Sequence, residues 1–594
     1  MALLPLAKLP INGNKLETLA SFRSSGVHLR PPLGRPDPNR AAAGAAVRCS
    51  AGPRNDSHAG FPVGFVFGAA SSAYQVEGAT DEGGRGPSIW DTFCKKYPDR
   101  SNGDPGAGSY YNYKEDVKRL AELGADVYRF SISWPRILPE GRGKPNPEGI
   151  QYYKNLIQEL LDHRIEPFVT IFHWDVPQKL ENEYGGFLHR RIVEDYKYFA
   201  EVCFKHFGDK VKHWITMNEP LTFCLGGYGL GIFAPGRCTP NLVYAGEHYE
   251  CPVGDSIREP YIVGHNILLA HAEVVQLYKQ NYQPHQAGKV GITLVTNWFV
   301  PYDNSPLGLE AQNRGLEFNL GWFMDPLKFG DYPFSMKALV RERLPTFTDE
   351  ESKKLKDSYD FIGINYYTSR YSKNQVFRLD FEPKICSDDA RILAPVDKNG
   401  VPIGYAETGS WVNVYPRGIK DLLLYVKERY SDPEIYITEN GVMQLEPGVM
   451  PKSLPDEVKD MYRAQYQSSH LHELVEAIRQ GVKVKGYFVW SLLDSFEWNT
   501  GYTSKFGLHY VNNSPEIPEK EFLARIPKQS AQWYKWFLSI AKTPKLFEEG
   551  EEEQEELEAF MASIPAVKAV PIKKKTTVDS STAPSEAKTS AFAS

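Results

Sequence analysis

Two glutamates have the residue type and position that acid–base or nucleophilic chemistry requires. Glu219 lies in TMNEP and Glu439 in ITENG, so each acid directly follows a β-branched, apolar run and precedes a chain-turning proline or glycine. A single acid at such a place is more often a solvated loop residue. Two carboxyl groups that face each other across one site, however, are what hydrolysis of a glycosidic bond requires.

Other polar and aromatic side chains come at the ends of similar apolar runs. They are Gln75, Arg129, His173 with Trp174, Asn218, Asn365 with Tyr366 and Tyr367, and Trp490. A structural role can explain any one of them, but it does not easily explain so many together. If the runs are parallel strands, their carboxyl ends meet at one face, and we expect these side chains to share one site.

The apolar runs alternate with amphipathic, helix-length segments, as in βαβ units. Examples of the helical segments are 114–124, 152–164 and 417–430, with apolar residues at i, i+3 and i+4. The strand candidates are FVFGAA near the start and residues 126–132, 166–174, 213–220, 288–295, 360–367, 434–441 and 484–494. This pattern predicts a single (β/α)8 TIM barrel over residues 60–543. The excess length must lie in long βα loops, with 229–260 and 371–411 as candidates.

The overall composition excludes several classes of function. The 594-residue chain has 68 Lys+Arg against 74 Asp+Glu, so it offers no basic field to a nucleic acid. No stretch approaches the roughly 20 apolar residues that cross a bilayer, and we expect no membrane partner. The 7 cysteines form no CxxC pair, which argues against a zinc site, although Cys238 and Cys251 could clip one loop.

The two ends of the chain differ in composition from the part between them. Residues 1–50 are rich in Ala, Arg, Ser and Pro, with Glu17 and Asp37 as their acids, which predicts a plastid transit peptide cleaved near Cys49. An ordinary disordered tail is the alternative. Residues 544–594 contain the acidic run EEGEEEQEEL, then three lysines and a Ser/Thr/Ala-rich finish. This composition predicts a disordered, solvated tail, with a functional acidic arm as the alternative.

From Phe61 to about Leu538 the sequence resembles the plant β-glucosidases of glycoside hydrolase family 1. The motifs that carry this resemblance are FVFGAASSAYQVEGA, YKEDVKRLAELGADVYRFSISWPRILP, FHWDVP, TMNEP, GHNILLAHA, FIGINYYTSR, YITENGV, VKGYFVWSLLDSFEWNTGY and FGLHYV. The resemblance implies a TIM barrel, hydrolysis with retention of anomeric configuration, a small-molecule β-glucoside as substrate, no metal and no cofactor. Formation of a homo-oligomer is left open.

Carried over by motif, Glu219 corresponds to the general acid/base and Glu439 to the nucleophile. The two carboxyl groups of a retaining enzyme lie about 5–5.5 Å apart, so we expect the charge on Glu439 to keep Glu219 protonated for the first step. Arg129 would be the nearby cation that keeps Glu439 ionised. Tyr367 resembles the family's tyrosine that hydrogen-bonds the nucleophile. For Arg129 and Tyr367 the alternative is structural pairing in the barrel core.

Further motif positions resemble the residues that bind glucose. Gln75 and His173 correspond to the ligands of the 3- and 4-hydroxyls, Asn218 to that of the 2-hydroxyl, and Glu497 with Trp498 to the pair facing O4 and O6. A carboxylate at this last position should repel a 6-phosphate. The remaining expected substrate-binding residues are Asn365, Tyr367, Trp490 as the stacking platform, and Trp411 as one wall of the leaving-group slot.

The resemblance extends to one loop, and the sequence departs from the family motifs at a few positions. The segment between Cys238 and Cys251 resembles the plant disulfide loop by its flanks, so a disulfide is expected there. GDPGAGSYYNYKED has Tyr-Asn where a histidine is common in the family, and MYRAQYQSSHL lacks the usual Arg-Ile spacing. These departures put the subfamily in doubt, and they do not touch the proposed chemistry.

The leaving group is less well defined by the sequence than the sugar. Relatives with glutamine in place of the acid/base cleave thioglucosides, so Glu219 favours O-glucosides. Plastid-targeted relatives include enzymes acting on steroidal saponins and on benzoxazinoids, and the tail favours a steroidal or other bulky specialised glucoside. Aromatic residues would either stack on such a fused-ring group or fill the loops: Phe223, Phe233, Tyr244, Phe377 and Phe381. A transglucosidase and a catalytically silent, lectin-like family member are the alternative functions.

Overall fold

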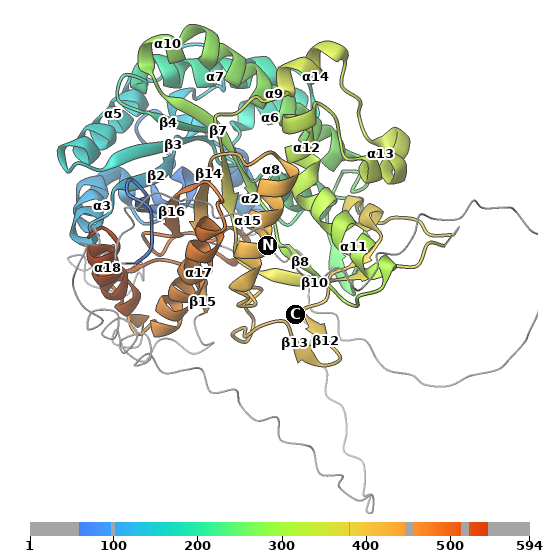
Figure 1. Cartoon of the computed structure of the whole chain (residues 1–594). Helices are drawn as coiled ribbons and strands as arrows, with labels where there is room; N and C mark the ends of the chain where they lie inside the picture. The colour runs from blue at the N-terminus through green and yellow to red at the C-terminus, as the bar shows by residue number, and fades with distance from the viewer. Residues whose placement is uncertain (1–58, 97–100, 379, 446–456, 513–521, 544–594) are drawn as a thin grey trace, which may run out of the picture. The chain divides into compact units, whose positions relative to one another are not determined.

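Eight parallel strands form a closed barrel at the centre of the molecule, in the order β1-β16-β14-β9-β7-β4-β3-β2. The computed structural model describes residues 59–96, 101–378, 380–445, 457–512 and 522–543 (Figure 1). The barrel strands are β1 (Val66–Ala70), β2 (Val127–Ser131), β3 (Glu166–Phe172), β4 (His213–Asn218), β7 (Lys289–Val295), β9 (Phe361–Asn365), β14 (Ile435–Asn440) and β16 (Val484–Trp490). Each corresponds to one predicted strand, and the predicted (β/α)8 barrel is confirmed.

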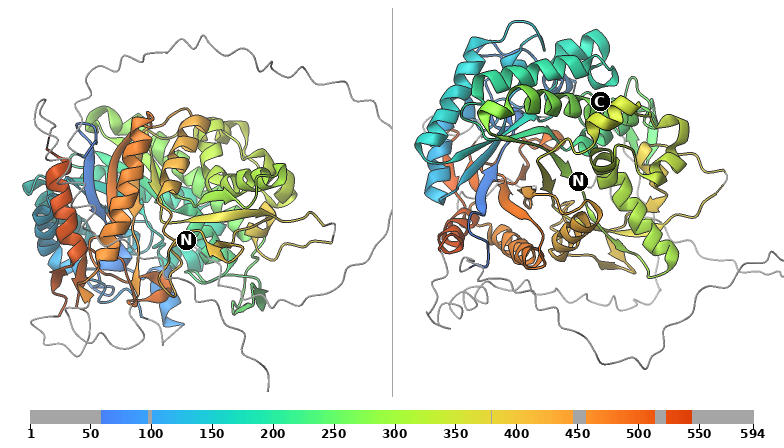
Figure 2. Two further views of the ribbon diagram at one scale, coloured as in Figure 1. Left: turned by 60° about the horizontal axis from the view of Figure 1, so that its bottom comes forward. Right: turned by 45° about the horizontal axis from the view of Figure 1, so that its top comes forward.

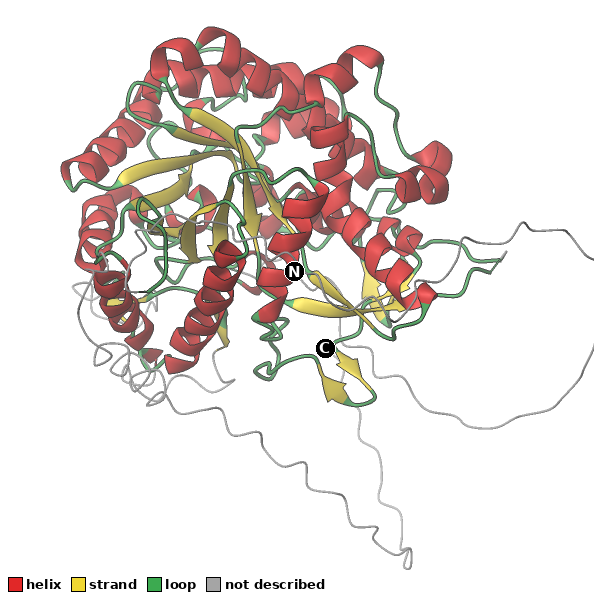
Figure 3. Ribbon diagram, in the orientation of Figure 1, coloured by secondary structure: helices red, strands yellow, loops and turns green. Residues whose placement is uncertain are grey.

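Helices surround the barrel strands on the outside, as Figure 3 shows in red and yellow. The main ones are α3 (Ser109–Leu123), α5 (Pro147–Asp162), α7 (Ile192–Phe207), α9 (Glu259–Asn281), α11 (Pro306–Leu316), α15 (Arg417–Arg429), α17 (Met461–Arg479) and α18 (Gln529–Ala541). Among the residues that the structure describes, no helix combines the length and apolar character needed to cross a membrane.

Helix α5 illustrates why these segments are helical. Its first residue is Pro147, and the side chain of Asn146 accepts a hydrogen bond from the N–H of Glu148, which satisfies one of the free N–H groups of the first turn. Apolar residues then recur every three or four positions, and all are buried: Ile150, Tyr153, Leu156, Ile157 and Leu160. Burial of this stripe against the barrel, worth about 25 cal/mol per Å², stabilises the helix.

Aromatic rings fill part of the barrel interior. The ring of Phe168 lies 5.4 Å from that of Phe361, 5.2 Å from that of Tyr436 and 5.1 Å from that of Phe488, so four strands contribute to one cluster. These residues belong to a larger buried apolar cluster. The interior is therefore a packed core, and the polar ends of the strands form a site only at the carboxyl face.

The two long loops that the sequence predicts lie outside the barrel strands. Residues 229–260 contain the hairpin of β5 (Leu242–Tyr244) and β6 (Glu247–Tyr249), and Cys238 is joined to Cys251 by a disulfide with the Cα atoms 5.4 Å apart. In and beside residues 371–411 a small sheet forms, visible beside the barrel in Figure 2: β8 (Trp298–Pro301), β10 (Ser369–Asn374) and β11 (Ile392–Leu393). The predicted transit peptide (1–50) and tail (544–594) lie outside the described residues.

Candidate active site

The strands that carry the two glutamates are both irregular next to them. The pairing of β4 with β7 shifts register between Ile215 and Asn218, just before Glu219. The pairing of β14 with β9 shifts between Ile437 and Glu439. Such irregularities occur next to active sites because they turn a side chain out of the regular alternation of a strand. Both glutamates therefore lie where the strand pattern is interrupted.

Glu219 has a strained backbone at the end of β4. It is the N-cap of the short helix α8 (Pro220–Cys224), with φ 44° and ψ 62°, in the left-handed region. A residue other than glycine in this region costs about 1–3 kcal/mol, and such strain persists only where the surroundings hold it. The N–H of Glu219 donates to the carbonyl of Thr293 on β7 at 3.0 Å, and the side chain is buried.

Glu439 is held by a cation and a phenol. The Nη1 of Arg129 forms an ion pair with Oε1 of Glu439, and the hydroxyl of Tyr367 donates to Oε2 at 2.5 Å. Arg129 comes from the middle of β2 and Tyr367 from just beyond β9, and all three side chains are buried. The predicted contacts of Arg129 and Tyr367 with this carboxylate are thus present in the structure.

Burial is the main influence on the ionisation of Glu439. It raises the pKa of the carboxyl to about 7, while Arg129 and the hydrogen bond from Tyr367 lower the pKa and the charge on Glu219 raises it. The expected effect of Arg129 therefore has the right direction, but burial outweighs it. The carboxyl becomes ionised as the pH rises through about 7, and it is the ionised form that can attack a carbon atom.

A continuous route of hydrogen bonds joins the two glutamates. Arg129 Nη2 donates to Asn218 Oδ1 at 2.6 Å, and the Nδ2 of Asn365 donates to the same oxygen at 3.3 Å. That Nδ2 also donates to Oε1 of Glu219 at 2.7 Å. The two carboxyl groups thus belong to one hydrogen-bond network, and Asn218 and Asn365 are the residues that link its two halves. Because the members fix one another, the geometry is set before any ligand binds.

The hydrogen bonds of Asn218 define the tautomer of His173. Asn218 Oδ1 accepts from Arg129, so its Nδ2 is the donor to Nε2 of His173, 3.1 Å away. Burial and the charge of Arg129 lower the pKa of His173 well below its ordinary value, so the ring is neutral and carries its proton on Nδ1. Nδ1 has no hydrogen-bond partner among the described residues and can donate to a ligand.

Two tryptophans flank His173. Its ring is nearly parallel to those of Trp490 and Trp498, with 5.9 Å between centroids in each case. Trp174 lies 4.6 Å from Trp498, and its indole N–H donates to the carbonyl of Asn218 at 2.8 Å. The flat faces and the free imidazole N–H together suit a ring-shaped ligand that bears hydroxyl groups.

Gln75 and Glu497 meet although they lie at opposite ends of the barrel sequence. Gln75 Nε2 donates to Oε1 of Glu497 at 3.2 Å and to the carbonyl of Phe496 at 2.8 Å. Burial raises the pKa of Glu497 well above its ordinary value, so the neutral form is favoured. This differs from our expectation of a charged Glu497 that repels a 6-phosphate, because the sequence does not reveal how completely the carboxyl is buried.

The aromatic residues expected around a leaving group do not form one wall. Phe223 is buried, 5.5 Å from Phe172 and 5.8 Å from Phe187, so it packs in the core. Phe233 is also buried, against Trp174. The other three aromatic residues have polar or charged neighbours. The hydroxyl of Tyr244 donates to Asp388, and Phe377 and Phe381 lie beside Arg391. Phe233 is therefore loop packing, which was the alternative, whereas Phe223 belongs to helix α8 and to the core.

Trp411 occupies a different position from those residues. It is partly buried, and its ring lies 5.4 Å from that of Tyr367, which bonds Glu439. Trp411 is thus one residue away from Glu439, and its expected role as one wall of the leaving-group slot stays a prediction.

Two features of this site were missed in the sequence. Trp174 stood among the strand-end residues, but its support of Asn218 was not foreseen. Thr222, whose hydroxyl donates to Oε2 of Glu219 at 2.8 Å, was not considered at all. Its spacing of three residues from Glu219, in the first turn of a helix that begins at Pro220, was the available signal.

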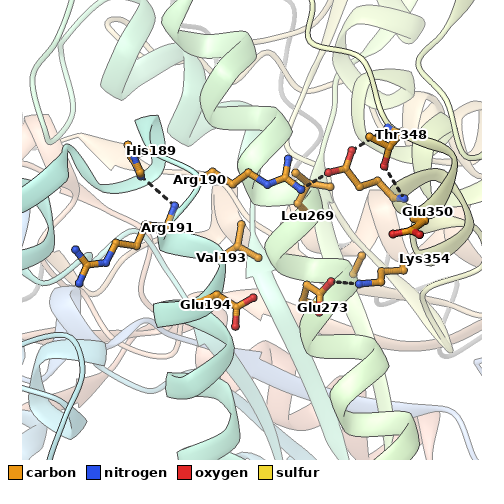
Figure 4. A pocket seen from close by; sticks show the side chains of 12 residues that line it. His189, Arg190, Arg191, Val193, Glu194, Leu269, Glu273, Thr348, Glu350 and Lys354 are labelled. Carbon is orange, nitrogen blue, oxygen red and sulfur yellow. Dashed lines mark hydrogen bonds and ion pairs between the residues drawn. The ribbon is translucent and has the colours of Figure 1, made fainter.

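A separate pocket of about 440 Å³ shares no residue with this site. It lies among residues of α7, α9 and α14 (Asp349–Leu355), and charged side chains surround it, with Arg190 and Glu351 forming an ion pair across it (Figure 4). Val193 and Leu269 also line it. It has no contact with the two glutamates, and the chemistry belongs to the barrel mouth.

Comparison with known proteins identifies the class to which this barrel and its two glutamates belong. The profile described as "Glycosyl hydrolase family 1" matches residues 57–543. The chain therefore belongs to glycosyl hydrolase family 1, and it is a glycoside hydrolase. The predicted resemblance is confirmed.

Relatives within the family come from several plants. The chain is 53% identical to β-glucosidase 12 of Oryza sativa subsp. indica over 82% of this chain and 94% of that protein. It is 54% identical to the furostanol glycoside 26-O-β-glucosidase of Hellenia speciosa, over 80% and 83%. It is 50% identical, over 81% and 83%, to a Triticum aestivum enzyme named as a chloroplastic β-D-glucosidase of a benzoxazinyl glucoside.

Solved structures agree with this assignment. A rice β-glucosidase, Os3BGlu6, has a TM-score of 0.77 and 44% identity, and the likeness covers 82% of this chain and all of that chain. A mutant of the same rice enzyme, solved in a covalent complex with glucose, gives the same values.

Proposed function

We propose that this chain is a retaining β-glucosidase that hydrolyses O-β-D-glucosides through a covalent glucosyl-enzyme, with Glu439 as nucleophile and Glu219 as general acid/base. The observation that carries the proposal is the unequal surroundings of the two carboxyl groups. Glu439 has a cation and a phenol as partners, whereas Glu219 has the neutral donors Asn365 and Thr222. A carboxyl paired with a cation suits a group that must be ionised, and one with neutral partners suits a group that gains and loses a proton.

The reaction then takes two displacement steps. The ionised Glu439 attacks the anomeric carbon while the bond from that carbon to the leaving oxygen breaks, and Glu219 gives its proton to that oxygen. Water next attacks the anomeric carbon and gives a proton to Glu219, the bond to Glu439 breaks, and glucose leaves with its configuration retained. Both glutamates return to their starting states. A covalent complex of the 44% identical rice enzyme with glucose supports the intermediate.

The sugar would be held by side chains around the nucleophile. We assign Nδ1 of His173 as a donor to a hydroxyl, and Gln75 and Glu497 as ligands on the side away from the leaving group. Asn218 would bind the 2-hydroxyl. The ring of Trp490 would stack on the apolar face of the sugar, and Trp498 would face O4 and O6. A buried site that hydrogen-bonds several hydroxyls rejects an epimer that leaves one of its groups unpaired, at a cost of about 1–3 kcal/mol.

Two variants test the roles of the glutamates. Glu439→Gln should abolish formation of the glucosyl-enzyme with every substrate. Glu219→Gln should spare that step for a nitrophenyl glucoside, since a good leaving group needs no proton, and added azide should yield β-glucosyl azide. Near-normal turnover by Glu439→Gln, or azide rescue of that variant, would overturn the assignment. Thermal unfolding of both variants excludes misfolding as the cause.

Two other functions use the same barrel. A transglucosidase differs in passing the glucosyl group to an acceptor other than water, and product analysis with an added alcohol or phenolic acceptor separates the two reactions. A silent, lectin-like family member would bind glucosides without cleaving them. The two carboxyl groups and their shared network favour an enzyme over this second alternative.

For the leaving group we propose a bulky specialised metabolite of the steroidal saponin type. The furostanol glycoside glucosidase of Hellenia speciosa, at 54% identity, supports this class, and Trp411 beside Tyr367 offers one flat wall for a fused-ring group. A kinetic screen of β-glucosides differing only in the aglycone tests it. A steroidal glucoside should exceed simple alkyl and aryl glucosides in kcat/KM by about tenfold, or about 1.4 kcal/mol. Equal values, or a preference for cellobiose-type oligosaccharides, would refute it.

We also propose that residues 1–50 direct the protein to plastids and that residues 544–594 form a solvated tail. Relatives from wheat and rye that are named chloroplastic, at 49–50% identity, support plastid import. Isolated plastids should import the chain and shorten it by about 50 residues. The sequon at Asn512 should carry no glycan in protein from native tissue, whereas a glycan there would indicate the secretory route.

A further inference from the structure

Thr222 lies next to Glu219 on the first turn of α8. Its side chain is buried, and its Oγ1 donates to Oε2 of Glu219 at 2.8 Å. Glu219 is the N-cap of α8, Pro220 is its first residue, and Thr222 is the third, so the contact spans one turn of helix. The left-handed backbone of Glu219 and the helix start at Pro220 together bring this hydroxyl to the carboxyl group.

The two oxygens of Glu219 have different kinds of partner. Oε1 accepts from Nδ2 of Asn365, and Oδ1 of the same amide accepts from the hydroxyl of Thr438 at 2.7 Å. The amide is thus fixed with its nitrogen towards Glu219, and an amide nitrogen can only donate. Oε1 is therefore kept as an acceptor. Oε2 faces a hydroxyl, which can rotate and either donate or accept, so a proton on the carboxyl belongs on Oε2.

We propose that Thr222 is a positioning residue for proton transfer: its hydroxyl supports Oε2 of Glu219 and stabilises the carboxylate that forms when the proton passes to the leaving oxygen. The inference rests on the proposed role of Glu219 as acid/base. During the first step the bond from Oε2 to its hydrogen breaks, the hydrogen bonds to the departing oxygen, and the Thr222 hydroxyl donates to the negative Oε2. Hydrogen bonds to a charged acceptor are stronger than those to a neutral one, so the contact gains strength as the proton leaves.

Removal of the hydroxyl should therefore affect one kind of substrate. Thr222→Val should lower kcat/KM about tenfold for an alkyl β-glucoside, whose poor leaving group needs the proton. It should leave kcat/KM for 2,4-dinitrophenyl β-glucoside within about twofold, because that leaving group departs without a proton. The basic limb of the pH profile for the alkyl glucoside should also move to higher pH, since the carboxylate of Glu219 has lost a donor. Thr222→Ser, which keeps a hydroxyl, should restore both properties.

A threonine six residues earlier in the chain provides a matched control. Thr216 on β4 is also buried, and its Oγ1 bonds Nδ1 of His271 at 2.7 Å, away from the glutamates. Thr216→Val should change kcat/KM for the two substrates to the same extent and should leave the pH profile in place. Thr222→Ala provides a second removal of the hydroxyl, with thermal unfolding measured for each variant, so that loss of the fold is separated from loss of the contact.

The results can separate this inference from the proposed function. Glu219→Gln is measured with the same two substrates, and if it lacks a leaving-group dependence, the acid/base assignment itself fails. The inference is wrong, and Thr222 is merely structural, under the following result. Glu219→Gln shows that dependence, but Thr222→Val and Thr222→Ala lower kcat/KM equally for both substrates and leave the basic limb of the pH profile unchanged. Unchanged activity of the Thr222 variants with both substrates would also overturn it.

Discussion

The strand ends and the loop of residues 371–411 depart from ordinary burial in opposite ways. At the strand ends, charged and polar side chains such as Arg129, Glu439 and His173 are buried. In the loop, apolar side chains are exposed, with Val376 at 72% and Phe377 at 57%. Folded proteins usually bury the second kind of side chain and expose the first.

The difference lies in how each region is fixed. Buried polar groups persist only if their hydrogen bonds are made, so the strand ends form a network in which each member limits the others. Apolar side chains on a loop have no such directional requirement. A change at the strand ends should consequently alter the chemistry, whereas a change in the long loops should alter the choice of leaving group or the local stability. The three predictions below examine this contrast.

The largest effect is expected for Arg129→Met. A nearby cation lowers the pKa of a carboxyl by about 1–3 units, so loss of Arg129 should raise the pKa of Glu439 further above 7 and leave it protonated at neutral pH. We expect kcat/KM at pH 7 to fall about 10- to 1000-fold and to recover partly as the pH is raised, as measured by pH–rate profiles.

The matched loop variant is Arg378→Met. Arg378 pairs with Asp380 at 2.8 Å, but both side chains are about 70% exposed, so the pair contributes about 0–1 kcal/mol. Its kcat/KM and thermal unfolding should stay close to those of the unmodified chain. A loss of activity comparable with that of Arg129→Met would contradict the division between the two regions.

An intermediate effect is expected for Tyr367→Phe. The hydrogen bond from Tyr367 lowers the pKa of Glu439, so its removal should raise that pKa. If Glu439 is the nucleophile, as we propose, it must be ionised to attack, so the acidic limb of the kcat/KM profile should move to higher pH by about one unit, the equivalent of about 1.4 kcal/mol. Tyr405→Phe, in the long loop and half-exposed, should leave the limb unmoved. A shift to lower pH would show that the sign of the Tyr367 contribution is wrong.

The smallest catalytic effect is expected on opening the disulfide. Cys238→Ser with Cys251→Ser should release a constraint of 13 residues in the loop 229–260, which such bonds stabilise by about 2–4 kcal/mol. Limited proteolysis within this loop should become faster, while kcat/KM for a simple aryl glucoside stays within about twofold. If turnover of that small substrate fell tenfold or more, the loop would contribute to the reaction centre itself.

The barrel could be predicted because its signals are local. Each strand is an apolar run of a few residues, each helix has a 3.6-residue period, and the carboxyl ends of parallel strands share one face. The polar residues that close those runs include Glu219, Glu439, Arg129 and Asn365, so their convergence followed from the topology. Their individual roles, in contrast, came from the resemblance to family 1.

The features that the sequence could not predict depend on where a side chain points and on how deeply it is buried. Phe223 was expected either at the leaving group or as loop packing, and it lies in the core instead, because α8 turns it towards Phe172 and Phe187. The neutral state favoured for Glu497 depends on burial by distant segments. Thr222 was overlooked because a threonine in the first turn of a helix is ordinary, and only the left-handed backbone of Glu219 brings it to the carboxyl.

The pairing of β1 with β16 has a consequence for the order in which the protein is made. These two strands close the barrel, with Ala70 opposite Trp490, and the segments that follow them supply Gln75 on one side and Glu497 on the other. The ribosome therefore adds both glutamates, one directly after β4 and one on β14, before it reaches the last strand. Until that strand leaves the exit tunnel, the emerging polypeptide carries both carboxyl groups without the contact between Gln75 and Glu497. That contact and the closed barrel can form only after translation has passed β16.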